Sequence, residues 1–190
     1  MVDIASLRDA YRTHKLALFD QLRSARAPTR SVHTVLRQLA ALADETLGAL
    51  WADAGFGHRL ALVAVGGFGR GELFPYSDVD VLLLLPEGED SGVEPARLEA
   101  FIGQCWDAGL EIGSSVRTVS ECLDEAAKDV TVQTSLLESR LVIGDKKLYA
   151  SFRKNFFAAI DPQAFFAAKS QEMRHRHQKF DNTPYALEPN

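Results

Sequence analysis

A glycine-rich turn joins two apolar runs in residues 62–85, LVAVGGFGRGELFPYSDVDVLLLL, and this stretch constrains the fold more than any other. The run at 60–65 is short, apolar and followed by glycines, which predicts a buried strand. A second run at 78–85 begins with two acids one residue apart, Asp78 and Asp80. We therefore expect two strands of one sheet, with the glycine turn and the two carboxylates at their junction.

The glycines of this turn favour phosphate binding, because glycine lets backbone N–H groups approach an anion without a Cβ in the way. Gly66 and Gly71 have the spacing of a P-loop, but Glu72 and Leu73 occupy the positions where that loop requires Lys and Ser or Thr. The GxGxxG pattern of a dinucleotide site fails too, because Glu72 occupies its third glycine position. A phosphate contact of another kind remains, beginning at Gly66 and Gly67.

The two acids predict a metal site. Side chains alternate between the faces of a strand, so Asp78 and Asp80 project from the same face. Two neighbouring carboxylates repel each other and are costly to desolvate unless a cation lies between them. Mg²⁺ prefers carboxylate oxygens together with substrate phosphates and water. We therefore expect a magnesium-binding platform for a phosphoryl-transfer reaction at the start of the second strand.

The rest of the chain has mainly helical patterns. Apolar spacing predicts a helix at 3–25 and another after Pro28 that ends at Gly55, and a third strand is expected at 109–118. Further helices are predicted at 96–107, from Ser120 with that serine as its cap, and at 131–145, 146–158 and 162–180. Irregular segments are expected at 86–95 and 181–190. Trp51 and Trp106 lie in helical patterns and are expected in the core.

Composition limits the possible partners. The chain has 190 residues, with 21 basic and 26 acidic side chains and a net charge of −5, so the charge that nonspecific nucleic-acid binding requires is missing. No stretch approaches the length of a membrane span, so no membrane partner is expected. Cys105 and Cys122 have neither zinc-site spacing nor the density of a disulfide scaffold, which favours a cytoplasmic location.

The stretch GGFGRGELFPYSDVDVLLL resembles the nucleotidyltransferase superfamily of DNA polymerase β type, whose signature is a glycine pair, a spacer and Asp-x-Asp in a strand. Its GRGEL and PYSD elements are similar to those of the bacterial PII uridylyltransferase/uridylyl-removing family. Three further stretches resemble the same family: WDAGLEIGSSVRTVSECL (106–123), DVTVQTSLLESRLVIGD (129–145) and YALEPN (185–190).

The resemblance implies an α+β nucleotidyltransferase fold, in which helices flank a small mixed sheet and further helices precede and follow it. We expect an N-terminal helical segment at 1–57, the nucleotidyltransferase core at 58–145, and at 146–190 the beginning of a helical region that continues in a longer protein. Members of this family also carry an HD-type hydrolase domain and two ACT domains, for which these residues leave no room.

Site residues follow from the same resemblance. It places Gly66 and Gly67 on the nucleotide phosphates and makes Asp78 and Asp80 catalytic metal ligands. Polymerase-type enzymes commonly add a third carboxylate from a neighbouring strand, and Glu111 is the candidate in this chain.

Two further residues keep alternative roles at this point. Arg70 can contact a phosphate or form an ion pair with Glu72. Ser77 can bind a phosphate or hydrogen-bond to nearby backbone, as serines in turns commonly do.

The function implied is Mg²⁺-dependent transfer of UMP from UTP to a tyrosine of the PII signal protein. Two alternatives stay open at the level of sequence. One is adenylyl transfer to another protein or to a small molecule, and the other is a nucleotide-binding fragment without turnover.

Overall fold

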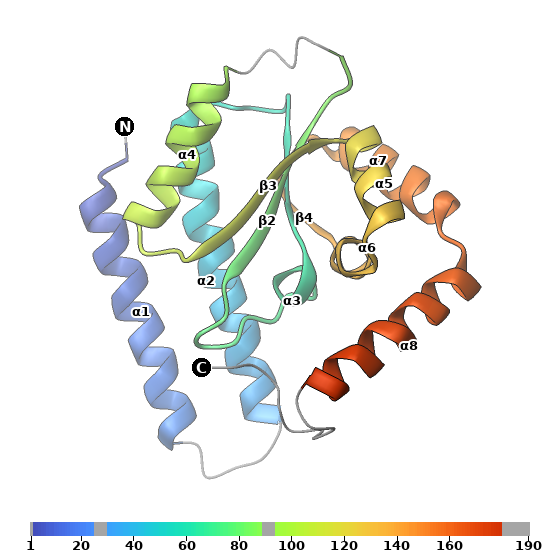
Figure 1. The fold of residues 1–190 in the computed structure, drawn as a ribbon. Helices are drawn as coiled ribbons and strands as arrows, with labels where there is room; N and C mark the ends of the chain where they lie inside the picture. The colour runs from blue at the N-terminus through green and yellow to red at the C-terminus, as the bar shows by residue number, and fades with distance from the viewer. Residues whose placement is uncertain (1, 25–29, 89–93, 180–190) are drawn as a thin grey trace.

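The computed structural model describes residues 2–24, 30–88 and 94–179, which form eight helices and four strands (Figure 1). The helices are α1 (Ile4–Ser24), α2 (Arg30–Ala54), α3 (Gly66–Gly69), α4 (Pro95–Asp107), α5 (Val119–Lys128), α6 (Val130–Leu137), α7 (Lys146–Ala159) and α8 (Pro162–Lys179). The strands are β1 (Ala61–Ala64), β2 (Val79–Leu85), β3 (Ile112–Thr118) and β4 (Arg140–Gly144). Residues 181–190 and the middle of the expected loop at 86–95 lie outside the described residues.

The four strands form one mixed sheet in the order β3-β2-β1-β4. Strand β1 pairs antiparallel with β2 on one side and with β4 on the other, whereas β2 and β3 are parallel. Parallel neighbours need a long crossover, and helix α4 lies in the connection between β2 and β3. The expected α+β fold with a small mixed sheet and flanking helices is confirmed.

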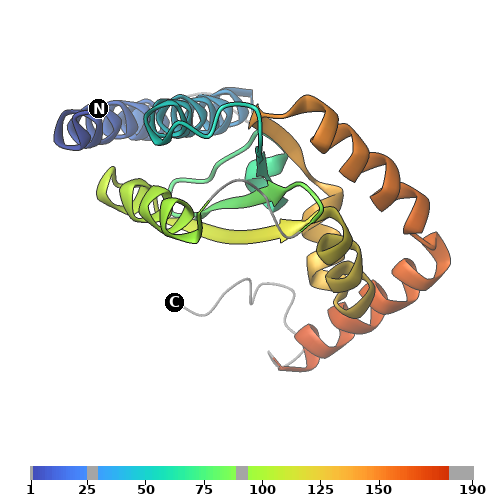
Figure 2. The same ribbon diagram turned by 90° about the horizontal axis from the view of Figure 1, so that it is seen from above.

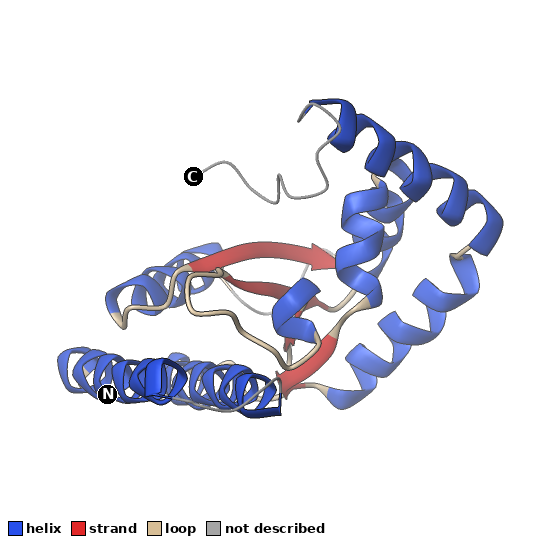
Figure 3. Cartoon of the chain, turned by 90° about the horizontal axis from the view of Figure 1, so that it is seen from below, coloured by secondary structure: helices blue, strands red, loops and turns tan. Residues whose placement is uncertain are grey.

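Helices cover both faces of the sheet (Figure 2). Alternating residues of β1 face opposite layers, so that Leu62 and Ala64 pack in one core cluster and Ala61 and Val63 in another. The first cluster includes side chains of α1, α2 and α4, and the second includes side chains of α5, α6 and α7. Figure 3 shows the same layering, with the strands between two groups of helices. The short apolar runs of the sequence are therefore buried on both faces.

One predicted helix is wrong. The sequence predicts a helix over 131–145, but α6 ends at Leu137 and the chain continues as strand β4. Within β4, Leu141 pairs with Val63 and Ile143 pairs with Leu62 of β1, with a register shift between the two pairs. The apolar spacing fits a helix, yet strand β1 offers a free edge for pairing, and this tertiary contact overrides the local pattern.

Two smaller predictions also need correction. Helix α5 begins at Val119, and its cap is Thr118 instead of Ser120. The Thr118 side chain accepts a hydrogen bond from the backbone N–H of Glu121, whose carboxylate accepts one from the Thr118 N–H, so the two form a capping box.

The two tryptophans differ. Trp51 is buried as expected, whereas Trp106 is 54% exposed and its expected burial is wrong. Helix α4 buries Leu98, Phe101 and Cys105, and Trp106 follows directly after this buried stripe.

In the described part of the chain, no helix is long and apolar enough to cross a membrane.

Candidate active site

Asp80 lies at the centre of the candidate site. Its backbone C=O accepts a hydrogen bond from the N–H of Val65 at 3.0 Å, which brings β2 alongside the start of α3. On its other side, Asp80 pairs with Gly113 of β3. A Cβ on Gly113 would collide with Oδ1 of Asp80 and lie 3.6 Å from its Cγ. The absent side chain of Gly113 therefore provides the space that the Asp80 carboxylate occupies.

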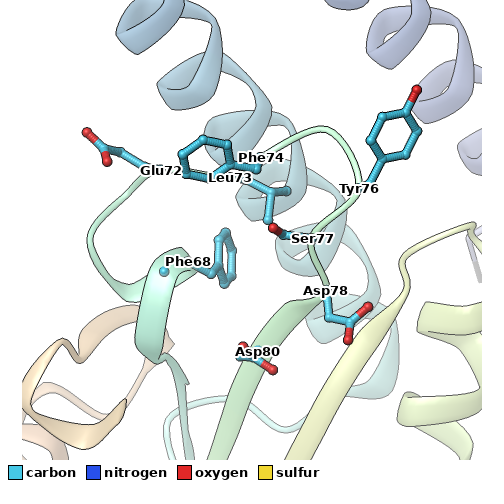
Figure 4. A pocket seen from close by; sticks show the side chains of 9 residues that line it. Phe68, Glu72, Leu73, Phe74, Tyr76, Ser77, Asp78 and Asp80 are labelled. Carbon is cyan, nitrogen blue, oxygen red and sulfur yellow. The ribbon is translucent and has the colours of Figure 1, made fainter. Parts of the chain in front are cut away.

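Asp78 and Asp80 line one cavity of about 250 Å³ (Figure 4). The cavity lies between α3 and the segment that leads into β2, and its lining is completed by Gly67, Phe68, Glu72, Leu73, Phe74, Tyr76 and Ser77. Asp78 precedes the first residue of β2 and Asp80 is the second residue of that strand. The structure thus brings the two acids, one glycine of the pair and Ser77 to a single cavity.

The electrostatic state of Asp80 reflects its surroundings. Partial burial of its carboxylate, followed by the negative charge of Asp78, raises the pKa of Asp80 above the ordinary value for aspartate. Both effects disfavour the charged form, and a cation bound between the two acids would remove the repulsion. Carboxylate oxygens are hard donors of the kind that Mg²⁺ prefers, so the donor set fits a divalent cation.

The glycine pair begins helix α3, which is a single turn. Gly66 has φ +58°, a left-handed conformation that glycine adopts without strain. A Cβ there would lie 3.7 Å from Oδ2 of Asp80 and 3.6 Å from Oγ of Ser135. Gly66 is therefore a direct neighbour of the Asp80 carboxylate.

Helix α3 is tightly packed against the chain around it. A Cβ on Gly69 would collide with the backbone C=O of Glu138 and lie 3.0 Å from that of Ala64. The third glycine of the GGFG segment is therefore needed for close approach between α3 and the link from α6 to β4. The glycine-rich segment is a packed helical turn, whose position relative to Asp80 is set by these contacts.

Arg70 follows α3 and forms an ion pair with Glu138. The alternative pairing of Arg70 with Glu72 is therefore wrong, and Glu72 instead contacts Nδ1 of His33 at 3.3 Å. Nη2 of Arg70 lies 3.7 Å from the position that a Cβ on Gly67 would occupy. The guanidinium group thus lies beside the second glycine of the pair, where it remains accessible to solvent.

A second arginine supports α3 from behind. Arg140 of β4 donates hydrogen bonds to both carboxylate oxygens of Asp44, at 2.8 and 3.1 Å. Its guanidinium carbon lies 5.3 Å from the centre of the Phe68 ring, and Nη2 approaches the Phe68 backbone oxygen at 3.4 Å. Arg140 therefore links α2, β4 and α3, and fixes Phe68, one of three aromatic residues that line the cavity.

The predicted third carboxylate lies apart from this cavity. Glu111 is exposed and precedes β3, and its backbone C=O accepts a hydrogen bond from the N–H of Val79 at 2.8 Å. Burial, followed by the charge of Glu111, raises the pKa of Tyr11 to about 12. Glu111 does not line the cavity, and among the described residues no group of three or more His, Cys, Asp or Glu side chains could hold a metal ion.

Three contributors to the site were missed at the level of sequence. Gly113 and Ser135 approach the Asp80 region from β3 and α6, and Arg140 supports α3 from β4. The alternation of 109–118 places Gly113 on one strand face, but its pairing with Asp80 depends on the sheet order. Ser135 and Arg140 have no local signal, because the segment that carries them has a helical pattern throughout.

The candidate site lies within a recognised domain. Residues 51–142 match the nucleotidyltransferase domain family. This range includes both strands of the glycine and Asp-x-Asp motif, together with β3 and most of β4.

Curated relatives match almost the whole chain. Enzymes named bifunctional uridylyltransferase/uridylyl-removing enzyme are similar to it in Burkholderia lata (51% identity over 97% of this chain and 21% of the relative) and Ralstonia nicotianae (53% over 95% and 20%). The relative of the same name in Burkholderia vietnamiensis is 52% identical over 97% of this chain and 21% of its own length. The chain spans about a fifth of the length of these relatives. Residues 51–142 therefore belong to the nucleotidyltransferase domain family, and almost the whole chain is similar to one part of the bifunctional uridylyltransferase/uridylyl-removing enzymes.

Proposed function

We propose that this chain is the transferase part of a uridylyltransferase, which moves UMP from UTP to a tyrosine of the PII signal protein and releases pyrophosphate. The observation that carries the proposal is the convergence of Asp78, Asp80 and Gly67 at one cavity, with Gly66 next to the Asp80 carboxylate. The relatives' printed name supports uridylyl transfer as the reaction. The protein acceptor and its tyrosine follow from the family resemblance.

Asp78 and Asp80 would hold the metal, for which Mg²⁺ is proposed. When bound, the ion would offset the repulsion between the two carboxylates and stabilise negative charge on the triphosphate. Both carboxylates line the same cavity, which supports a shared ligand. Glu111 stays a proposal as a third catalytic carboxylate, and its position outside the cavity lining means that it would have to act from the edge of the site.

Gly66 and Gly67 would receive the phosphates, since a backbone without side chains permits close approach by an anion. The Arg70 guanidinium, beside Gly67, would add positive charge at the same end of the site. Ser77 lines the cavity, so its hydroxyl is available to a phosphate oxygen. Its backbone N–H is already used, because it donates to the C=O of Phe74 at 3.2 Å.

The chemistry is an in-line displacement at the α-phosphorus. The acceptor hydroxyl oxygen forms a bond to this phosphorus, the bond to the oxygen that bridges to the β-phosphate breaks, and pyrophosphate leaves. The hydroxyl proton passes to a carboxylate of the site or to water. The reaction is proposed to take place in the cytoplasm, where UTP and a PII protein are both accessible.

The test is UTP-dependent labelling of PII protein with the label on the α-phosphate of the nucleotide. Asp78→Asn and Asp80→Asn should each abolish labelling, and labelled ATP offered in parallel should give little product. Preferred use of ATP would support adenylyl transfer instead. Binding of UTP with Mg²⁺ but no labelling by the chain would assign nucleotide binding without turnover to these residues.

A further inference from the structure

The turn between α3 and β2 presents one aromatic ring to the cavity without a ring partner. Phe74 lines the same cavity as Gly67 and Asp80, and it is 52% exposed. Among the described residues, neither an aromatic ring nor a cationic side chain is stacked on it. Phenylalanine is normally buried, so a half-exposed ring at the edge of a polar cavity needs an explanation.

The backbone on both sides of Phe74 is fixed. Leu73 is buried, and its N–H donates to the C=O of Leu36 in α2 at 3.1 Å. The N–H of Ser77 donates to the C=O of Phe74 at 3.2 Å, which closes a turn. Pro75 follows Phe74 in this turn and restricts the backbone further. The exposure of Phe74 is therefore set by an anchored turn.

The neighbouring aromatic residue has a different role. Tyr76 is 86% exposed, but its ring lies 6.0 Å from that of Phe19 in α1. Figure 4 shows Tyr76 pointing away from Asp80, whereas the Phe74 ring lies toward Glu72 and the α3 side of the cavity. Tyr76 thus ties the turn to α1, and Phe74 is the ring left for a ligand.

We propose that Phe74 is the stacking surface for the nucleobase of the bound nucleotide. The inference rests on the proposed function, which places the triphosphate at the glycine pair and the carboxylates. A base attached to that triphosphate needs a flat apolar contact, and stacking on an aromatic ring typically contributes about 1–3 kcal/mol per base. Every base has such a face, so Phe74 adds affinity without choosing uracil.

A protein-docking role fits the same ring less well. Protein interfaces bury a broad surface around their aromatic anchors. Phe74 instead faces a cavity of about 250 Å³ whose polar lining includes three carboxylates and the hydroxyl of Ser77. A half-exposed ring beside these polar groups matches a ligand with one flat apolar part and one charged part, which is the chemistry of a nucleotide.

The test compares UTP with inorganic tripolyphosphate, which lacks the base, in calorimetric titrations with Mg²⁺. Phe74→Ala should weaken UTP binding about tenfold and leave tripolyphosphate binding within about twofold. Phe74→Trp should retain UTP affinity because it retains a stacking face. Trp106→Ala is the matched control, since Trp106 is similarly exposed at 54% and does not line the cavity.

The outcomes separate this inference from the proposed function. Equal effects of Phe74→Ala on both ligands, or no effect on UTP, would overturn the stacking role. Unchanged UTP affinity with a raised KM for the PII acceptor would assign the ring to protein docking and likewise overturn it. If the unaltered chain bound neither UTP nor tripolyphosphate, the proposed nucleotide site itself would fail.

Discussion

The carboxylate of Asp80 occupies the space that a side chain at position 113 of β3 would fill if this residue were not glycine. The two residues are paired across parallel strands, so neither can move far without disturbing the sheet. A glycine in the interior of a strand usually weakens it, and here it makes room for a functional side chain.

Gly113→Ala should therefore damage the site more than the fold. The new methyl group would collide with Oδ1 of Asp80 and force the carboxylate out of its present position. We expect Mn²⁺ affinity to fall and uridylyl transfer to drop by about 100-fold, as small misplacements of catalytic groups commonly cause. Calorimetry with Mn²⁺ and the labelling assay measure the two effects.

Gly103→Ala in α4 is the matched control. A Cβ at Gly103 would have no atom within 4 Å, and alanine favours helix over glycine by about 1 kcal/mol. This variant should be slightly more stable and fully active. Retention of metal binding by Gly113→Ala would show that Asp80 has another rotamer available for the ion.

Asp80→Asn should stabilise the chain in the absence of metal. The folded state raises the pKa of Asp80, so the charged carboxylate costs stability above that pKa. This cost disappears as the pH falls below the ordinary carboxyl pKa, where both folded and unfolded chains carry the proton. We expect a gain on the order of 0.5 kcal/mol at neutral pH, since solvent screens an exposed charge.

Urea denaturation with EDTA, followed by circular dichroism, measures this difference. The advantage of Asp80→Asn should shrink steadily toward about pH 3, where unaltered Asp80 is also protonated. Added Mg²⁺ should stabilise the unaltered chain and not the variant. A variant less stable than the parent at neutral pH would contradict the electrostatic explanation.

Arg140→Met should loosen the support behind α3. The change keeps an apolar stem near Phe68 but leaves the Asp44 carboxylate without its two hydrogen bonds. Because both side chains are about two-thirds buried, we expect a loss of about 2 kcal/mol in the free energy of unfolding. Chemical denaturation of Arg140→Met, of Asp44→Asn and of the double variant gives three losses in the free energy of unfolding. The difference between the loss in the double variant and the sum of the two single losses is the coupling energy. Simple additivity would mean that the two residues do not act together.

Thr118→Ala and Ser120→Ala test the observed helix cap against the one that the sequence predicts. Removing the Thr118 hydroxyl breaks the capping box with Glu121 and should cost about 1 kcal/mol. Ser120 donates to Glu87 at 2.9 Å at the surface, so its loss should cost about 0.5 kcal/mol or less. Thermal unfolding of the two variants side by side shows which loss of stability is larger. A larger loss for Ser120→Ala would favour the predicted cap.

The sequence predicted best those parts of the site that depend on local pattern. The apolar runs around the glycine turn predict buried strands, and the two-residue spacing of Asp78 and Asp80 predicts that both acids lie close together where β2 begins. Both acids accordingly line one cavity. The glycine turn and the two acids lie in one continuous stretch of chain, so their proximity could be predicted without knowing which distant segments pair.

The parts that local pattern did not reveal depend on pairing between distant segments. Arg70 finds Glu138 only because β4 lies beside β1, and β4 itself was hidden in a helical pattern. The predicted pattern places Glu111 on the same strand face as Gly113, but Glu111 lies before β3 and does not line the cavity, and its catalytic role stays a prediction. Local periodicity contains no information about which strand edge a segment will meet.

The position of β4 also has a consequence for biosynthesis. The inner strand β1 is flanked by β2, which follows soon after it, and by β4, which is made only after α4, β3, α5 and α6. During translation the glycine turn is therefore synthesised well before β4, which carries its supporting residue Arg140. Nascent chains halted before Arg140 should expose an unpaired sheet edge and recruit chaperones until synthesis resumes.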